Sequence, residues 1–490
     1  MLDASARRAD PADVLVTGGL IRAIGPPGLA APSEATLIDA RDRLLIPGLV
    51  NGHTHSHGAL ARGVPGDRVP LEVLLTLAGA VNGHRSADDK RLSAQLSAIE
   101  LIRRGCTACY DMFVEAPVAT PEGVLAAAQG YVDVGLRAVV APMIADRTLY
   151  QALPGLLDAI PQPMRRELEA LSTAPAATTL AACRTVLEKW PFDRDRVRPG
   201  LGPTIPLHCS DDFLIACRDL ARAHDVGIQM HVAESRGQAV IGVKRYGKTL
   251  TAHLADLGML GPKFSAAHAV WLDRDDIRRL ADAGASVSHN PLSNLRLGAG
   301  VARPRLMLDG GVQVGIGTDS PSSADTQNMF EAMRLASYLS RISTSDHRRW
   351  LGADEVFRLA TEGSAAVLGM ADRLGRLAPG YCADIVFLDL SNANYVPLND
   401  ALLQLVFGES GSAVERVMIN GRMVLEANHI LTVDEAALRK QAETTAARLR
   451  EQNAPALATA RALEQFVGAF CIGLAREPYP ITRVFPPDPE

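Results

Sequence analysis

The sequence predicts an α/β protein, namely a (β/α)8 TIM-like barrel with a small β-sandwich formed from both chain ends and a C-terminal helical extension. Three observations support this prediction. Eight strand-like runs alternate with helical segments through the middle of the chain. Short strands separated by glycine turns recur only near the two ends. A long stretch rich in alanine, glutamate and arginine follows the last of these strands.

The two chain ends share a pattern of short strands. Asp13–Thr17 and Leu20–Ile24 flank a Gly-Gly pair, which is typical of a β-hairpin. Similar strands return late in the chain, at Ala383–Asp389 and Val414–Asn420. We expect one small β domain built from both ends, with the barrel inserted between them. The expected segments are 1–47 and 372–432 for the sandwich, 48–371 for the barrel and 433–490 for the helical extension.

The middle of the chain alternates between strand-like and helical patterns. Helical segments such as Asp88–Arg104 and Asp275–Ala283 separate most of the strands. Eight strands in this alternation favour a closed parallel barrel, with an open doubly wound sheet as the alternative. No glycine-rich phosphate loop is present in the sequence. The eight runs are Leu44–Asn51, Cys106–Asp111, Leu136–Met143, Val197–Gly202, Gly227–His231, Phe264–His268, Ala285–His289 and Val312–Thr318.

The last part of the chain, residues 434–468, has a helical pattern with recurring leucines. We expect Asn453–Pro455 to break it into two helices, because proline lacks the backbone donor that a helix interior uses. The proline-rich tail Pro478–Glu490 is expected to be extended. The pattern leaves open whether this appendage packs on the body of the protein or on a partner subunit.

Composition excludes several kinds of partner. The net charge is -5 and no basic run occurs, which argues against a nucleic-acid partner. No uninterrupted apolar run reaches about 18 residues, so no membrane span is expected. The N-terminus lacks a secretory signal, and the seven cysteines form no framework, so we expect a cytoplasmic protein. Cys106 and Cys109 form an isolated C-x-x-C within an apolar run, where core packing is favoured over a redox or zinc pair.

Functional side chains of such a barrel sit where the strands end. His53 and His55 end the first strand at positions i and i+2, so both side chains face the same way. His231 ends the fifth strand, and Glu234 follows it by three residues. The sixth and eighth strands end in His268 and Asp319. Any one of these residues is commonly structural, but the four strand ends together indicate a metal site.

The chemistry expected of this set is hydrolysis. Histidine nitrogens with an aspartate suit Zn²⁺, and also accept Fe²⁺ or Mn²⁺. One such divalent ion lowers the pKa of water from about 15.7 to near 7. A carboxylate such as Glu234 can take the proton of that water and pass it on. The cluster has no serine or cysteine beside a base, which argues for direct attack by water.

These motifs resemble the metal-dependent amidohydrolase superfamily, in particular the cytosine deaminase-like group with its methylthioadenosine/S-adenosylhomocysteine deaminases and triazine hydrolases. The resemblance covers about residues 12–430. It rests on Pro47–His55, His231–Glu234, Ala267–His268, Ser288–Asn294 and Gly317–Asp319. It implies that His53, His55, His231 and Asp319 hold one metal ion. It also implies that Glu234 shuttles protons, that His268 hydrogen-bonds the attacking water, and that Asp319 accepts a proton from it.

The chain departs from this group where a substrate would be recognised. Thr204 stands where the adenosine-type deaminases carry a histidine, and Leu71–Leu75 stands where they carry a tryptophan. Ser320 replaces the usual glycine after the metal aspartate. These changes argue against simple adenosine recognition. The further candidates for substrate contact are His57, His208, Asn294 and Ser320.

Three functional hypotheses follow. The favoured one is an aminohydrolase, or deaminase, acting on a small nitrogen heterocycle such as a purine, pyrimidine, pterin or triazine. The second keeps the chemistry but releases chloride or an alkylamine, or cleaves an amide C–N bond. The third is a non-catalytic metal-binding relative, which the presence of Glu234 disfavours. The resemblance also implies a homo-oligomer, either a dimer or a tetramer.

Overall fold

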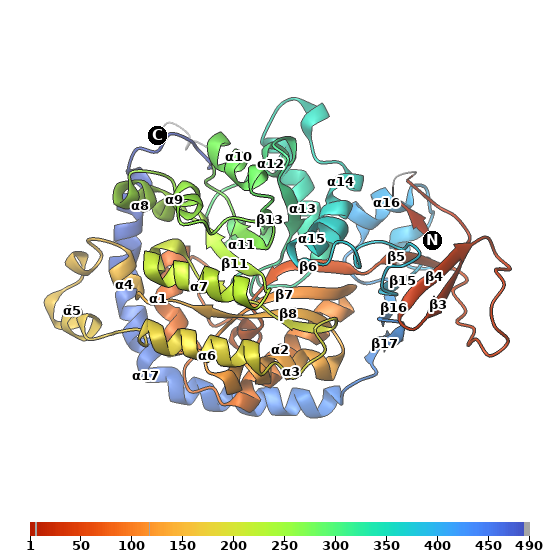
Figure 1. Ribbon diagram of the computed structural model, residues 1–490, viewed down its shortest axis with the longest axis horizontal. Helices are drawn as coiled ribbons and strands as arrows, with labels where there is room; N and C mark the ends of the chain where they lie inside the picture. The colour runs from red at the N-terminus through yellow and green to blue at the C-terminus, as the bar shows by residue number, and fades with distance from the viewer. Residues whose placement is uncertain (5–6, 117, 485–490) are drawn as a thin grey trace.

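The computed structural model describes residues 1–4, 7–116 and 118–484, and its centre is a parallel β-barrel surrounded by helices (Figure 1). The barrel strands form two parallel sheets, one in the order β10-β8-β7-β6 with β9 paired to β8, the other in the order β11-β12-β13-β14. Their bounds are β6 Leu49–Thr54, β7 Cys106–Val114, β8 Arg137–Ile144, β9 Val197–Pro199, β10 Gly202–Pro203, β11 Ile228–Val232, β12 Phe264–His268, β13 Ser286–His289 and β14 Gln313–Ile316.

Backbone hydrogen bonds join the two sheets at both edges. On one side, the amide of Gln229 donates to the carbonyl of Leu201 at 3.1 Å, and the amide of His231 donates to Thr204 at 2.9 Å. On the other side, the amide of Asp319 donates to the carbonyl of His53 at 2.9 Å. The sheet therefore closes on itself, and the predicted barrel is confirmed in preference to an open sheet.

The first predicted strand, Leu44–Asn51, is wrong in its bounds. The structure divides this run into β5 (Arg43–Pro47), which pairs antiparallel with the sandwich strand β15, and β6, which begins the barrel. The division falls at Gly48, where a Cβ atom would lie 2.0 Å from Thr107 Oγ1. Two consecutive buried strands give one continuous apolar run, so hydrophobicity alone does not mark the passage from one sheet to the other. The predicted strand Val197–Gly202 is likewise interrupted, between β9 and β10.

The small β domain comes from both chain ends, as predicted. Its larger sheet has the order β18-β17-β16-β15-β5, and the hairpin β3-β4 packs beside it. The amide of Ile21 on β4 donates to Tyr381 at 2.9 Å, which ties the N-terminal hairpin to the late segment. Ile21 packs with Leu45, Ile385 and Phe387 in a separate hydrophobic core. The bounds are β3 Asp13–Thr17, β4 Leu20–Gly25, β15 Ile385–Asp389, β16 Val414–Ile419, β17 Arg422–Glu426 and β18 His429–Ile430.

Helices cover the outside of the barrel (Figure 1). The predicted helices at 88–104 and 275–283 are present as α2 and α10, each closed at its N-terminus by a capping box. Cys106 and Cys109 on β7 are buried free thiols within the core. The principal covering helices are α2 Ala87–Arg103, α3 Pro121–Val134, α6 Ala176–Glu188, α7 Asp211–Ala223, α8 Arg236–Tyr246, α9 Leu250–Asp256, α10 Arg274–Asp282, α11 Pro291–Arg296, α12 Pro304–Asp309, α13 Met329–Ile342 and α14 Ala353–Arg358.

The C-terminal extension is one helix, α17, which runs over 42 residues from Glu435 to Arg476. The predicted break at Pro455 is therefore wrong. Packing on both sides of the proline outweighs the lost hydrogen bond, which costs about 3 kcal/mol. Before it, Arg448 Nη2 lies 2.5 Å from Asp89 Oδ2. After it, Leu463 and Val467 are buried in a core cluster.

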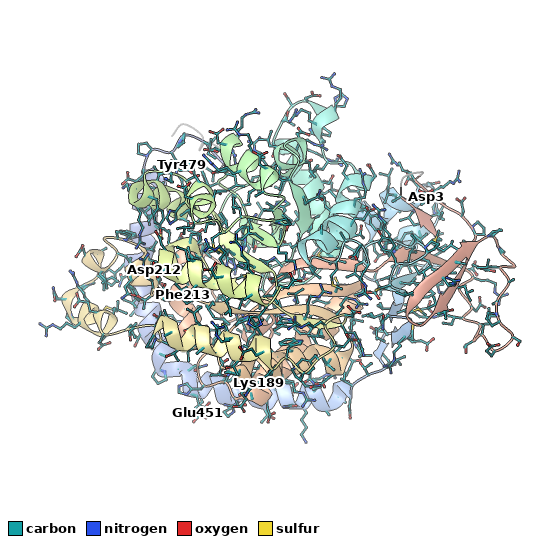
Figure 2. The ribbon with its side chains drawn as sticks, in the orientation of Figure 1. Asp3, Lys189, Asp212, Phe213, Glu451 and Tyr479 are labelled. Carbon is teal, nitrogen blue, oxygen red and sulfur yellow. The ribbon has the colours of Figure 1, made fainter. Side chains whose placement is uncertain are left out.

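Helix α17 runs along one side of the barrel and ends near α8; Figure 2 labels Glu451 within the helix and Tyr479 just beyond its C-terminal end. It packs on α1 (Leu71–Val81), so the extension lies on the body of the same chain. By length and composition it is also long and apolar enough to cross a membrane, with a mean hydropathy of 1.2 over its most apolar window. One such helix is weak evidence, and its packing on α1 accounts for part of its apolar character.

Candidate active site

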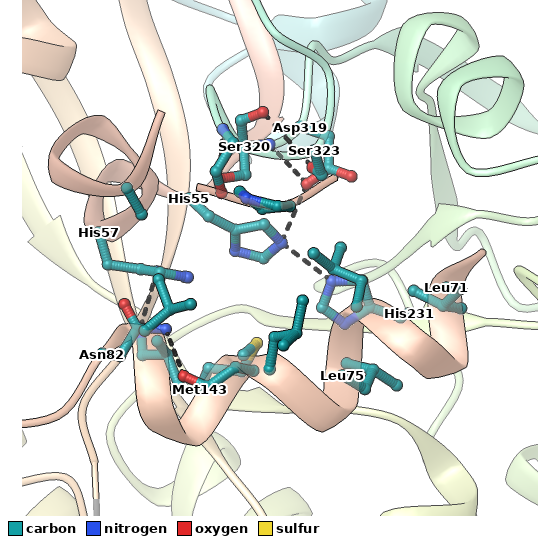
Figure 3. Close-up of a pocket in the computed structure, with 18 of the residues that line it drawn as sticks. His55, His57, Leu71, Leu75, Asn82, Met143, His231, Asp319, Ser320 and Ser323 are labelled. Carbon is teal, nitrogen blue, oxygen red and sulfur yellow. Dashed lines mark hydrogen bonds and ion pairs between the residues drawn. The ribbon is translucent and has the colours of Figure 1, made fainter. Parts of the chain in front are cut away.

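The side chains predicted to carry chemistry lie together at the C-terminal ends of the barrel strands. His53 is on β6 and His55 follows it, His231 is on β11, and His268 ends β12. Asp319 follows β14. Figure 3 shows His55 between His231 and Asp319, with interactions to both. Segments that are distant in sequence therefore converge at one mouth of the barrel.

The backbone is strained at two of these residues. His268 has φ 68° and Asp319 has φ 67°, in the left-handed region that residues other than glycine rarely adopt. Such strain persists only where the surrounding structure enforces it, and it is frequent at functional sites. At Asp319 the enforcing contacts include the hydrogen bond of its amide to His53 O and that of the Ser320 amide to Asp319 Oδ1, 2.6 Å long.

Hydrogen bonds fix which nitrogen of each imidazole carries the proton. His55 Nδ1 lies 2.6 Å from the carbonyl of Met112, and His231 Nδ1 lies 2.8 Å from the carbonyl of Thr204. A carbonyl can only accept, so both Nδ1 atoms are donors. His53 Nδ1 lies 2.7 Å from Gln229 Oε1 and is a donor for the same reason. In the neutral imidazoles, each Nε2 atom is then left with a lone pair.

These lone pairs face one another. The Nε2 atoms of His55 and His231 are 3.1 Å apart, and Asp319 Oδ1 lies 3.2 Å from His55 Nε2. His53 Nε2 is 3.7 Å from Asp319 Oδ1 and has no hydrogen-bond partner although it is buried. Burial lowers the pKa of His53 well below its usual value, and that of His231 to about 3, so both rings are neutral near neutral pH. The donor set fits one divalent cation.

A second group of possible ligand atoms shares part of this set. The ligand atoms of His53, His55 and His231 lie within 4.8 Å of one another, and so do those of His53, His268 and Asp319. His268 Nε2 is 4.0 Å from Asp319 Oδ2 and has no hydrogen-bond partner. His268 therefore borders the same space and is positioned to contact a molecule bound there.

Glu234 is the buried carboxyl group beside this cluster. Burial raises its pKa well above the usual value, and the charges of Asp319 and Glu72 add to the effect. Glu234 Oε1 lies 3.5 Å from His268 Nδ1. A buried carboxyl group with a raised pKa is suited to holding and releasing a proton near neutral pH.

A cavity opens onto these groups, with an empty volume of about 770 Å³ that includes its solvent-open part. One wall carries His55, His231, Glu234 and Asp319, and the opposite wall is helix α1 (Figure 3). Among the described residues, none that lines the cavity is a lysine or arginine. Its apolar lining comprises Ala61, Pro65, Leu71, Leu74, Leu75, Leu77, Ala78, Val81, Val114, Met143, Ile205 and Leu297.

The remaining sequence candidates fall in different places. His57 and Ser320 line the cavity, and His57 Nδ1 accepts a hydrogen bond from the Val114 amide at 3.2 Å. Asn294 is not among the residues that line the cavity; its Oδ1 is 2.8 Å from His268 Nδ1, so it orients His268. His208 is in a short turn, and the structure does not bring it to the cavity.

Sequence reasoning missed two parts of the site. Gln229, which orients His53, is a polar residue within an apolar strand, two positions before His231 and so on the same face. That position was a usable signal. In the sequence, Leu71–Leu75 is recognised only as the counterpart of a tryptophan in related enzymes, whereas Leu71–Val81 is a helix that forms a wall of the cavity. Asn82, at the C-terminal end of this helix, also lines the cavity.

Comparison with known proteins agrees with this geometry. Residues 44–424 match the model of the amidohydrolase family. A 5-methylthioadenosine/S-adenosylhomocysteine deaminase from Syntrophobacter fumaroxidans is 33% identical over 443 residues, covering 89% of this chain and 94% of the relative. A 5'-deoxyadenosine deaminase from Methanosarcina barkeri is 31% identical, covering 89% of this chain and 93% of the relative.

Solved structures show the same likeness. An adenosine deaminase from Xanthomonas campestris with bound zinc has a TM-score of 0.79 and 28% identity, over 90% of this chain and 94% of the other. The atrazine chlorohydrolase of Arthrobacter aurescens, in complex with zinc, has a TM-score of 0.79 and 28% identity, over 89% of this chain and 95% of the other. The match of the family model across most of the chain, together with these relatives, shows that the protein belongs to the amidohydrolase family.

Proposed function

We propose that this protein is a zinc-dependent aminohydrolase that releases ammonia from a small nitrogen heterocycle. One observation carries the proposal. Three imidazoles whose Nδ1 atoms are hydrogen-bonded direct their Nε2 lone pairs at one space beside Asp319, and Glu234 and the cavity adjoin that space. The retention of Glu234 argues against a non-catalytic metal-binding relative.

His53, His55, His231 and Asp319 would hold the ion. Their mixed nitrogen and oxygen donors suit Zn²⁺ and tolerate Fe²⁺ or Mn²⁺, and two solved relatives contain zinc. When bound, such an ion makes water a strong nucleophile at neutral pH. Gln229 and the carbonyls of Met112 and Thr204 would hold the three rings in the required tautomer.

The protein's own groups would then move the protons. Glu234, buried and lining the cavity, would take a proton from the attacking water and deliver it to the ring nitrogen next to the reacting carbon. His268 Nε2, which has no protein hydrogen-bond partner, would hydrogen-bond the attacking oxygen. Asn294 keeps the His268 ring in place through Nδ1. Asp319 would accept the remaining proton of the attacking oxygen, and that proton would pass to the amino group, so that the C–N bond breaks and ammonia leaves.

The residues that line the cavity narrow the range of substrates that we expect it to bind. The relatives are named as deaminases of adenosine derivatives and as an atrazine chlorohydrolase. The wall of leucines on α1, and the absence of lysine or arginine among the described lining residues, favour an uncharged ring with an apolar substituent. The likeness to an atrazine chlorohydrolase supports a second candidate activity, in which chloride or an alkylamine leaves the ring, or an amide C–N bond is cleaved.

Ammonia release from a panel of purines, pyrimidines, pterins and triazines, with the zinc-loaded protein, tests the proposal. We expect turnover of at least one heterocycle, and loss of turnover in Glu234→Gln with zinc still bound. Release of chloride or alkylamine instead would establish the second candidate. No product of any kind across the panel, from fully loaded protein, would contradict both. We further propose a cytoplasmic location, no membrane or nucleic-acid partner, and a dimeric or tetrameric assembly.

A further inference from the structure

Glu72 is a buried carboxyl group that the proposed chemistry does not use. It lies in the first turn of α1 and is only 5% exposed. A buried carboxyl group is costly unless it is hydrogen-bonded. Here the hydroxyl of Ser235 donates to Glu72 Oε1. Glu72 thus lies buried within the helix that forms the cavity wall, although it does not itself line the cavity.

Ser235 connects Glu72 to the segment that carries Glu234. It is the residue after Glu234 and the N-cap of α8, where its Oγ accepts a hydrogen bond from the Gln238 amide at 3.1 Å. Gln238 Oε1 in turn accepts from the Glu234 amide at 3.0 Å. Hydrogen bonds thus hold both the Glu234 backbone and the residue after it, and the Ser235 hydroxyl extends this network to Glu72.

Helix α17 packs against the other side of the same carboxyl group. The pKa of Glu72 is raised by burial, and the carboxyl group and the thiol of Cys471 on α17 lie close enough to influence each other's pKa. At Gly237 on α8, a Cβ atom would lie 3.1 Å from Glu72 Oε1 and 3.4 Å from Leu474 Cδ1 on α17. The three helices α1, α8 and α17 therefore meet at Glu72, with little space between them.

Helix α1 depends on such support. Its N-cap residue is Pro70, which supplies no side-chain hydrogen bond to the first turn. On either side of Glu72 in the sequence, Leu71, Leu74 and Leu75 line the cavity. Any movement of the first turn would therefore move the apolar wall relative to Glu234.

We infer that Glu72 is a positioning residue, which fixes the apolar wall on α1 against the Glu234 segment through the hydroxyl of Ser235. This inference rests on the proposed function for its consequence in catalysis, since the wall would hold the non-reacting part of the substrate. A shift of about 1 Å in such a contact costs up to about a hundredfold in rate. The structural part, the attachment of α1, does not depend on any activity.

The test compares Glu72→Ala, Glu72→Gln and Ser235→Ala with the wild-type protein. Glu122→Ala is the matched control, because Glu122 is also a first-turn glutamate but is exposed and lies on α3. Hydrogen exchange of the amides of residues 71–81 is measured in zinc-loaded protein. We expect at least about tenfold faster exchange there in Glu72→Ala and Ser235→Ala. Glu72→Gln, whose amide oxygen still accepts from Ser235, should exchange like the wild type.

A second experiment compares KM for two substrates, a heterocycle that carries an apolar substituent and the same heterocycle without the substituent. Glu72→Ala should raise KM for the substituted substrate about tenfold, change it less for the bare ring, and leave zinc content unchanged. Glu72→Gln should restore most of the loss. The inference would be overturned if Glu72→Ala showed the same hydrogen exchange in residues 71–81 and the same KM as the wild type. It would also be overturned if Glu72→Gln showed exchange as fast and a KM as high as Glu72→Ala. If the wild-type protein turns over no heterocycle, the proposed function fails. The hydrogen-exchange measurements would still decide whether Glu72 holds helix α1 in place.

Discussion

The Nε2 atoms of His55 and His231 face each other at 3.1 Å, although the Nδ1 atom of each ring donates to a backbone carbonyl. Two unprotonated nitrogens at this distance repel each other, because neither can donate a hydrogen bond to the other. A cation between them removes the repulsion. Two nitrogens each about 2.0–2.1 Å from a tetrahedral zinc ion lie about 3.3 Å apart, close to the separation seen here. Burial of the neighbouring His53 Nε2 without a partner points to the same conclusion.

Loss of one imidazole should abolish stoichiometric metal binding. We expect the zinc content to fall from about one ion per chain in the wild type to a small fraction of that in His231→Ala. Only three protein ligands remain in the variant, and water can enter the space that the imidazole occupied. Metal analysis after dialysis measures this. His429→Ala, an exposed histidine on β18, is the control and should keep its metal. Full occupancy in His231→Ala would place the ion elsewhere.

Removal of the metal should lower stability. A ligand bound only by the folded state stabilises it by about 2.7 kcal/mol at a free concentration one hundred times Kd. We therefore expect the Tm to fall on chelation and to return when zinc is added. Thermal unfolding in the two states measures the shift. An identical Tm with and without chelator, in protein shown to have lost its metal, would argue against a site formed on folding.

Gln229 should affect metal affinity without being a ligand. Its Oε1 orients His53, while its Nε2 donates to Gly52 O at 3.0 Å. Replacement by leucine leaves His53 Nδ1 without an acceptor, and such changes typically cost about 10–100-fold in metal affinity. Competition with a zinc chelator measures the change. Gln129→Leu, on the outer helix α3, is the control, and equal affinity in the two variants would contradict the assignment.

The raised pKa of Glu234 predicts a pH-dependent stability. An acid whose pKa is higher in the folded state than in the unfolded state destabilises the protein as pH rises from its ordinary value towards the raised one. In metal-free protein, Glu234→Gln should therefore match the wild type below about pH 4.5 and become more stable than it as pH rises. Unfolding by urea across this range measures the difference. Glu122→Gln is the control, and a constant difference for Glu234→Gln would contradict the account.

Pro455 offers a test of the continuous helix α17. Alanine at this position restores the missing amide inside a helix, and we expect the free energy of unfolding to rise by up to about 3 kcal/mol. Chemical unfolding of the full chain measures the gain. If the chain instead broke into two helices at this point, alanine would give no gain.

The sequence predicts what depends on local periodicity and misses what depends on tertiary contacts. His53 and His55 at positions i and i+2 of a strand, and His231, His268 and Asp319 at strand ends, suffice to predict convergence, because the carboxyl ends of parallel strands share one edge. The strand division at Gly48 could not be predicted, since both strands are buried and apolar. Helix α17 continues through Pro455 because of contacts with residues more than 300 positions away.

The position of the cavity wall also could not be predicted from the sequence, because it depends on tertiary contacts. The run Leu71–Leu75 marks an apolar segment, but its place opposite the metal-side residues depends on α17 and on the Ser235–Glu72 hydrogen bond. These contacts join parts of the chain that are far apart in sequence. His208 is close to a strand end in sequence, but it lies in the short turn Pro206–His208 and is not among the residues that line the cavity.

Zinc K-edge X-ray absorption of the purified, zinc-loaded protein tests the central claim most directly. The account predicts one zinc ion per chain with imidazole scattering from three histidines, at about 2.0–2.1 Å, and at least one oxygen ligand at about 2.0–2.2 Å. The imidazole signal should weaken in His55→Ala. A spectrum dominated by sulfur ligands, or one that lacks histidine scattering and is unchanged in His55→Ala, would contradict the claim that these imidazoles and Asp319 share one cation.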